Sequence, residues 1–391
     1  MSHRIEPEGH WSVDLGGVHA VFGAGALERM GEQARDLVAE GTHVLVVTDP
    51  GLEAAGHVDR AVASLRDAGL DACVFDGVEE NPTTAHAEAA AEAARACGAE
   101  LLVGLGGGSS MDCCKAANFL VSNGGAMEDY WGVDKATKPM LPSIGVPTTA
   151  GTGSEAQRFA LVSQVDSHRK MACGDKKARF RTVLLDPDLI ATVPRDVAAV
   201  TAMDAVSHAL ESYVSTRRNP VSQLFARESW RLLERSFEPF LQNSDDAQAR
   251  ADMLLGAHLS GAAIEASMLG AAHSCANPLT ARHGVVHGVA VGLMLPHVIR
   301  FNGDAVAGLY AELNATAGLN GHVPLAAPDR LAARVAELQD AAGLPRHLGH
   351  YGIDADGLGV LAHEAADQWT ANFNPRRVDR DRLLGLYEAA L

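Results

Sequence analysis

The chain has 391 residues, of which 47% are hydrophobic and 21% are charged, the composition of an ordinary globular protein. A chain of this length exceeds the usual size of one hydrophobic core, so two domains are expected. Its formal net charge of −17 argues against a nucleic acid or an anionic membrane surface as a partner.

The N-terminal segment and the cysteines bear on the compartment in which the protein works. The segment from Met1 to Asp14 lacks the apolar run of a secretory signal, and no other stretch approaches the roughly 20 apolar residues that cross a bilayer. The six cysteines lack the paired spacing of a metal site and are sparse for this length. A cytoplasmic protein with free thiols and no membrane partner is therefore expected.

The first half of the chain alternates short apolar runs with amphipathic stretches. Residues 43–49 (His-Val-Leu-Val-Val-Thr-Asp) are typical of a strand that is buried on both faces. Further strands are predicted at 72–75, 100–105, 143–146 and 182–185, helices at 51–68, 84–97 and 111–120, and a β-hairpin at 159–165 and 170–173. This order predicts an α/β domain whose parallel sheet has helices on both faces and binds ligands at the carboxyl ends of its strands.

After Asp186-Pro187-Asp188 the apolar pattern becomes helical. Helices are predicted at 197–215, 222–241, 247–268, 285–299, 328–342, 355–368 and 380–390, with few strand candidates among them. The expected fold is therefore an N-terminal α/β domain, residues 1–191, followed by an all-α C-terminal domain, residues 192–391.

Two loops follow predicted strands of the sheet. Gly106-Gly107-Gly108-Ser109 comes directly after strand 100–105, with Asp112 three residues on. Glycines let the backbone approach an anion closely, and the N-terminus of the next helix offers N–H groups to phosphate. The loop 147–155 (Pro-Thr-Thr-Ala-Gly-Thr-Gly-Ser-Glu) supplies short hydroxyl side chains suited to a pyrophosphate and a ribose. Each loop alone is compatible with a turn that binds nothing, but two at successive strand ends favour a dinucleotide site.

Asp49 ends the first clear strand, where it could accept hydrogen bonds from both hydroxyls of an adenosine ribose. Its carboxylate would repel a 2′-phosphate, which favours NAD over NADP. The alternative is that Asp49 caps the helical stretch that begins near Pro50.

One Asp and three His in the second half form a candidate metal set. Asp204 and His208 are four residues apart in a predicted helix and project from the same face. His273 and His287 are separated by Pro278, so we expect them to reach the same point from different elements. Both lie among small apolar residues, where an imidazole without a partner would be costly. The set suits zinc or ferrous iron, and ordinary core or surface histidines are the alternative at this point.

Together the motifs resemble the iron-containing, group III alcohol dehydrogenases. The resemblance rests on Gly-Gly-Gly-Ser-x-x-Asp at 106–112, the loop 147–155, Met-Asp-x-x-x-His at 203–208, and His-Gly-Val-Ala with Leu-Pro-His-Val at 287–298. It covers nearly the whole chain. It implies a dinucleotide-binding domain (1–191), a helical metal-binding domain (192–391), a cleft metal between them, Fe²⁺ or Zn²⁺, and a homo-oligomer, often a dimer.

The resemblance also assigns roles to individual residues. The metal ligands that it implies are Asp204, His208, His273 and His287. The NAD-binding positions that it implies are Asp49, Asn81, Gly107, Gly108, Ser109, Asp112, Thr148, Thr149, Thr152 and Lys170.

One position departs from the pattern of many relatives. They carry a second His four residues after the first downstream ligand, proposed to assist proton transfer, and this chain has Asn277 there. Asparagine cannot act as a general acid or base at neutral pH. The proton route then uses water and the nicotinamide ribose, or His283, ten residues after His273, takes over.

The activity implied by the resemblance is reversible oxidation of a small primary or secondary alcohol to an aldehyde or ketone, with NAD and a metal that polarises the substrate oxygen. A reductase for an anionic aldehyde bearing a carboxylate or phosphonate stays open, because charged side chains lie in or near the motifs: Arg158, Arg282, His283 and Arg376. Solvated surface charges are the commoner explanation for such residues. A dehydroquinate synthase-like lyase and a noncatalytic NAD-binding protein are weaker alternatives. The loop 147–155 and the ligand segments fit the alcohol dehydrogenases better.

Overall fold

The computed structural model describes residues 9–166, 169–319 and 326–391. The chain forms two compact units. The first unit contains Met1–Thr149 and Gly153–Val193, and the second contains Ala150–Thr152 and Pro194–Leu391.

The first unit is built on a seven-stranded sheet with the order β1-β2-β10-β7-β5-β3-β4. All neighbouring strands are parallel except the pair β1 and β2. The strands are β1 (Trp11–Leu15), β2 (Val18–Phe22), β3 (His43–Val47), β4 (Asp71–Phe75), β5 (Leu101–Gly106), β7 (Ser143–Pro147) and β10 (Thr182–Leu185). The predicted parallel α/β sheet is confirmed, and the β1–β2 hairpin is an addition that the sequence analysis did not contain.

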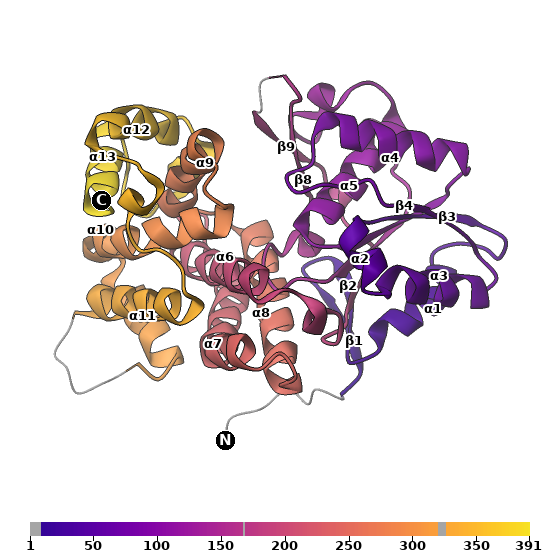
Figure 1. Cartoon of the computed structure of the whole chain (residues 1–391), viewed down its shortest axis with the longest axis horizontal. Helices are drawn as coiled ribbons and strands as arrows, with labels where there is room; N and C mark the ends of the chain where they lie inside the picture. The colour runs from indigo at the N-terminus through magenta and orange to yellow at the C-terminus, as the bar shows by residue number, and fades with distance from the viewer. Residues whose placement is uncertain (1–8, 167–168, 320–325) are drawn as a thin grey trace. The chain divides into compact units, whose positions relative to one another are not determined.

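Helices cover both faces of this sheet (Figure 1). On one face, Leu27, Met30 and Leu65 from the helical segments η1 (Ala26–Arg29), α1 (Met30–Arg35) and α3 (His57–Asp67) pack in one core cluster with strand residues such as Val46 and Val103. The helices α4 (Thr84–Ala96) and α5 (Gly108–Asn123) pack together on the other face. The strands therefore need apolar side chains on both faces, which explains their continuous apolar runs.

Two predicted helices differ in extent from those observed. The stretch predicted as one helix at 51–68 is two helices, α2 (Pro50–Ala54) and α3, because Gly56 between them has φ +74°. The helix predicted at 111–120 begins earlier, since α5 starts at Gly108. The glycine-rich loop thus runs directly into the first turn of α5.

A small second sheet in the first unit has the order β6-β9-β8 and packs on α5. Its strands are β6 (Gly132–Val133), β8 (Phe159–Ser163) and β9 (Lys170–Gly174). The antiparallel pairing of β8 with β9 confirms the predicted hairpin. Residues 167–168 of its turn lie outside the described residues.

Among the described residues the second unit contains helices and no β-strand. The helices are α6 (Arg195–Val214), α7 (Pro220–Gln242), α8 (Ala247–Ala266), α9 (Ala271–His283), α10 (His287–Thr316), α11 (Ala327–Ala342), α12 (Leu358–Ala366) and α13 (Arg380–Ala389). The helix α6 packs against α7, α8 and α10, and from Ala202 to Val214 every residue is buried. The all-helical character predicted for this half is confirmed.

Two of these helices were not foreseen in full. The helix α9 was not predicted, because Pro278 inside it lacks the N–H that a helix interior uses. The helix predicted at 285–299 continues as α10 to Thr316, across a kink at Val306 (φ −139°).

Short 3₁₀ segments complete the chain: η2 (Met127–Tyr130), η3 (Ser154–Ala156), η4 (Lys176–Ala178), η5 (Leu189–Thr192), η6 (Leu348–Tyr351), η7 (Ala355–Gly357) and η8 (Trp369–Phe373). Over the ranges that the structure describes, no helix has the length and apolar character needed to cross a membrane.

Candidate active site

Three histidine side chains of the second unit converge on one carboxylate oxygen of Asp204. Asp204 and His208 project from α6 one turn apart, His273 comes from α9, and His287 is the first residue of α10. Measured from Oδ1 of Asp204, the Nε2 atoms of the three histidines lie at 3.3, 3.6 and 3.9 Å in chain order. The structure therefore brings together all four residues of the candidate metal set.

The inner part of this cluster is buried. Asp204, His208 and His273 are at most 5% exposed, and each offers a ligand atom within 4.8 Å of the other two. Oδ1 of Asp204 and Nε2 of His273 have no hydrogen-bond partner among the residues that the structure describes. Buried polar atoms without partners are costly, and a cation between them would satisfy both. The donor set of one carboxylate and imidazole nitrogens fits a divalent iron or zinc ion.

The charges in the cluster depend on one another. Burial would raise the pKa of the Asp204 carboxyl, but the surrounding imidazoles hold it well below its usual range. Burial lowers the pKa of the His208 imidazole to about 4, and the Asp204 carboxylate offsets this only in part. For His273, the carboxylates of Asp204 and Glu211 outweigh burial and raise the pKa to about 9. At neutral pH Asp204 is a carboxylate and His208 a neutral imidazole, which are the protonation states that bind metal, whereas His273 must release a proton when a cation binds.

A glycine positions His287. Gly288 follows it in the first turn of α10, and a Cβ at Gly288 would lie 2.2 Å from the carbonyl oxygen of Val200. Only glycine allows the start of α10 to lie this close to α6. His287 itself is partly exposed, which leaves one side of the cluster open.

In the first unit, the loops after β5 and β7 lie next to each other. Gly106 has φ +150°, and a Cβ there would lie 2.4 Å from Oγ of Ser110, so the turn requires glycine. Gly107 is the N-cap of α5, has no side chain to cap it, and would contact Thr149 through a Cβ at 3.5 Å. The start of α5, with Gly108, and the loop that holds Thr149 thus form one edge where an anion can meet helix N–H groups.

Asn81 and Ser109 meet at this edge. The backbone N–H of Asn81, which has φ +54°, donates to Oγ of Ser109 at 3.3 Å. Asp49 accepts from Gly51 N at 3.1 Å, as the N-cap of α2, and from Ser110 Oγ at 3.2 Å. The capping role considered for Asp49 is therefore observed, and each oxygen retains lone pairs for a further donor.

The remaining nucleotide positions occupy different surroundings. Thr148 is buried, and its N–H donates to Gly106 O at 3.0 Å. Lys170 is exposed at the start of β9, where it lies opposite Ser163 of β8 in the antiparallel register. Thr152 belongs to the second unit.

Asp112 faces a buried lysine that the sequence analysis did not single out. Nζ of Lys115 lies 3.1 Å from Oδ1 of Asp112, which also accepts from Oγ of Ser154 at 2.5 Å. The i, i+3 spacing of an acid and a base in a predicted helix was the available signal.

The residues considered for proton transfer and anion binding are exposed or bonded to neighbouring groups. His283 is the last residue of α9 and is exposed. Asn277 is partly buried, and its Nδ2 donates to Oε1 of Gln368 at 2.9 Å. Arg282 is paired with Glu364, and Nη1 of Arg376 donates to Phe301 O at 2.8 Å. Both guanidinium groups therefore already have partners within the second unit.

Glu211 is a further residue that the sequence analysis missed. It lies on α6 three residues after His208, and its Oε2 is 2.6 Å from Nδ1 of His273. The spacing Asp-x-x-x-His-x-x-Glu from Asp204 places all three side chains on one helix face, which was the available signal.

Comparison with known proteins bears on both halves of the chain. Residues 18–187 match the family described as iron-containing alcohol dehydrogenase, and residues 198–391 match the Fe-containing alcohol dehydrogenase family, C-terminal. Alcohol dehydrogenase 4 of Schizosaccharomyces pombe is 33% identical over 374 residues, which cover 95% of this chain and 87% of the relative. The NAD-dependent methanol dehydrogenase of Bacillus methanolicus is 30% identical over 359 residues, which cover 91% of this chain and 94% of that relative.

A solved structure of a 1,3-propanediol oxidoreductase superposes with a TM-score of 0.92 at 30% identity, covering 98% of this chain and 99% of that one. Since family matches span both halves of the sequence, the chain belongs to the iron-containing alcohol dehydrogenase family and is an enzyme of alcohol and aldehyde oxidoreduction.

Proposed function

We propose that this enzyme interconverts a small primary or secondary alcohol and its aldehyde or ketone, with NAD as the hydride carrier and a divalent metal ion in the second unit. The observation that carries the proposal is the buried Oδ1 of Asp204, without a hydrogen-bond partner among the described residues and with three imidazole nitrogens within 3.9 Å. A site of this kind costs stability unless a cation occupies it.

Asp204, His208, His273 and His287 are the proposed ligands. When bound, the metal ion supplies a Lewis acid for the substrate oxygen, and NAD accepts or returns the hydride. The protein holds two of the donors firmly, because Asp204 and His208 come from adjacent turns of the buried stretch Ala202–Val214 of α6. Iron and zinc both suit these ligands. The family description favours iron.

The first unit is the proposed NAD site. The uncapped start of α5 at Gly107 offers helix N–H groups to the pyrophosphate, and Thr149 lies beside it. The Asp49 carboxylate is proposed to accept from the adenosine ribose hydroxyls and to disfavour a 2′-phosphate. The relative from Bacillus methanolicus, 30% identical, is named as NAD-dependent, which supports this cofactor.

The proton route stays a prediction. Asn277 cannot exchange a proton at neutral pH, and His283 is exposed at the end of α9. If His283 acts as the acid or base, His283→Ala lowers the hydride-transfer rate and changes its pH profile. An unchanged rate and profile would leave water and the nicotinamide ribose as the route.

The test is a substrate panel with metal-reconstituted protein in both directions. Short primary and secondary alcohols, diols, neutral aldehydes, and aldehydes bearing a carboxylate or phosphonate are assayed with NAD or NADH, before and after removal of the metal with a chelator. We expect turnover of neutral substrates that is lost in the chelated protein and restored by Fe²⁺ or Zn²⁺. Absence of a bound metal together with absence of NADH turnover would refute the proposal.

The anionic aldehydes in the panel test a second substrate class. Arg282 and Arg376 are both engaged with neighbours in the second unit, which argues against their use in anion binding. A homodimer is also proposed and is measured by light scattering of the purified protein. The cytoplasmic location expected from the sequence stays a prediction.

A further inference from the structure

The start of α9 is held by side chains that are remote in the sequence. The N–H of Ala272 donates to Oε1 of Glu211 at 2.7 Å, and the N–H of Ala271 donates to Oδ1 of Asn374 at 3.2 Å. Gly270 makes room for both, since a Cβ there would lie 3.0 Å from each of these oxygens. The first Glu211 oxygen is thus fixed to the backbone of α9, one residue before His273.

The second Glu211 oxygen determines which nitrogen of His273 faces the candidate metal ligands. Oε2 lies 2.6 Å from Nδ1, so Nδ1 carries a proton that it donates to the carboxylate. A neutral imidazole protonated at Nδ1 has its lone pair on Nε2. Nε2 of His273 is the atom that lies 3.6 Å from Oδ1 of Asp204 and lacks a hydrogen-bond partner among the described residues. Because the contact with Glu211 keeps the proton on Nδ1, Nε2 is the nitrogen that a cation would deprotonate and bind.

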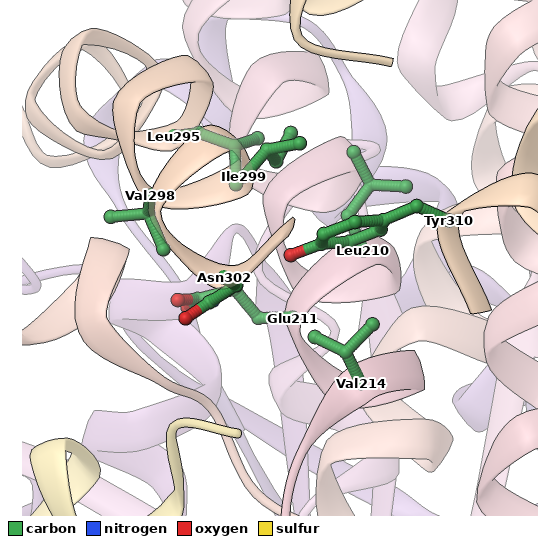
Figure 2. A pocket seen from close by; sticks show the side chains of 8 residues that line it. All are labelled: Leu210, Glu211, Val214, Leu295, Val298, Ile299, Asn302 and Tyr310. Carbon is green, nitrogen blue, oxygen red and sulfur yellow. The ribbon is translucent and has the colours of Figure 1, made fainter. Parts of the chain in front are cut away.

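On the side of Glu211 that faces away from His273, the surroundings offer little to stabilise the carboxylate charge. It is 4% exposed and borders a small cavity of about 10 Å³, shown in Figure 2, with Asn302 and Tyr310 as the other polar lining residues. Burial raises the pKa of the Tyr310 hydroxyl, which keeps it protonated. The rest of this lining is aliphatic and carries no positive charge: Leu210, Val214, Leu295, Val298 and Ile299. A buried carboxylate in such a place requires nearby positive charge. A cation bound to Nε2 of His273 would supply it through the imidazole ring that Glu211 holds.

The formal charges are consistent with a divalent ion. With a metal ion bound, Asp204 and Glu211 would contribute two negative charges, and the imidazoles, with Nε2 of His273 deprotonated, would contribute none. A divalent cation would balance the pair, and carboxylate–histidine–metal arrangements fix the ring of the ligand and increase its basicity.

We propose that Glu211 is a positioning residue of the metal centre, which holds His273 in the tautomer and orientation that bind a divalent cation and so strengthens metal binding. This inference rests on the proposed metal-dependent function and adds a residue to it that does not itself touch the metal.

The test is metal affinity rather than turnover. The full-length apo-protein is titrated with Zn²⁺ in competition with a chromophoric chelator, for the wild type and for Glu211→Gln. Glutamine fills the same space but offers an acceptor to only one of the two donors, so we expect the dissociation constant to rise about 10- to 100-fold. Ser229→Ala is the matched control, because Oγ of Ser229 makes an equally buried bond to Gly256 O between α7 and α8, away from the cluster.

Each outcome decides one question. A weaker Zn²⁺ complex in Glu211→Gln with an unchanged one in Ser229→Ala supports the inference. Equal affinity in wild type and Glu211→Gln overturns it while leaving the proposed function intact, whereas a wild type that binds neither Zn²⁺ nor Fe²⁺ defeats the proposed function itself. If Glu211→Gln does not fold, Glu211→Asp is measured instead. Its carboxylate is too short to reach both donors, and wild-type affinity in that variant would equally overturn the inference.

Discussion

Nζ of Lys115 lies 3.1 Å from Oδ1 of Asp112, one turn earlier on α5, and the lysine is 1% exposed. The same Nζ donates to the carbonyl oxygen of Ser154 at 3.0 Å and to its Oγ at 2.7 Å. The ion pair therefore fixes Ser154, at the end of the loop 147–155, onto α5.

Replacing the lysine of this pair is expected to destabilise the first unit strongly. In Lys115→Met the Asp112 carboxylate is left buried without its cation, a change that typically costs about 3–5 kcal/mol. Lys115→Met/Asp112→Asn removes both charges and should recover part of that loss. Urea unfolding of the wild type and both variants measures this, and a double variant no more stable than the single one would argue against the pairing.

Asp49→Asn is expected to weaken the preference for NAD over NADP. Asparagine is as good an N-cap as aspartate, so α2 keeps its bond to Gly51, while the repulsion of a 2′-phosphate is removed. We expect the ratio of kcat/KM for NADP to that for NAD to rise by about 10-fold or more, since each 1.4 kcal/mol is tenfold. A ratio equal to that of the wild type would place the ribose away from Asp49.

His297 is expected to make stability depend on pH. Burial lowers its pKa to about 4, and the charges of Arg300, His347 and Arg346 act in the same direction. Arg382, from α13, lines the same surface depression. Between about pH 6.5 and pH 4 the unfolded chain binds a proton at this ring that the folded protein does not, so stability is lost as the pH falls through this window.

The variant His297→Gln lacks this titration. Between about pH 7.5 and pH 5 the wild type should lose about 1–2 kcal/mol more stability than the variant, after allowance for partial exposure of the ring. Unfolding midpoints at several pH values measure the difference. All other groups titrate in both proteins, and parallel pH curves would contradict the assignment.

The thiols are expected to fall into two classes. Burial raises the pKa of Cys113 and of Cys173 to about 12 and also raises those of Cys114 and Cys275, so their thiolate populations are negligible at neutral pH. Cys73 and Cys97 differ from these four in being partly exposed, although burial also raises the pKa of Cys97 to about 11. An aromatic disulfide reagent should modify at most these two in the native protein and all six after unfolding in guanidinium. Rapid modification of more than two native thiols would contradict this.

Gly288→Ala is expected to weaken metal binding through His287. The added Cβ would lie 2.2 Å from the Val200 carbonyl oxygen, so the first turn of α10 must move away from α6. The matched control is Gly308→Ala on the same helix, where nothing lies within 4 Å and alanine should add about 0.5–1 kcal/mol of stability. Zn²⁺ titration of both apo-proteins compares them, and equal affinities would show that His287 does not depend on this contact.

The sequence by itself determined the elements whose pattern is local. The apolar run at His43–Val47 is long enough and β-branched enough to indicate a strand buried on both faces, and the four-residue spacing of Asp204 and His208 places both on one helix face. The glycines at 106–108 likewise indicated a turn into a helix, because their conformational freedom is a property of the residue itself.

Only the tertiary structure decided which remote side chains meet. The helix α9 could not be predicted from its sequence, because it contains Pro278. Its first turn is held by Glu211, 61 residues from its partner Ala272, and by Asn374, 103 residues from its partner Ala271. Lys115 likewise meets Ser154 across 39 residues. No local period predicts such contacts, because they depend on how separate helices and strands pack.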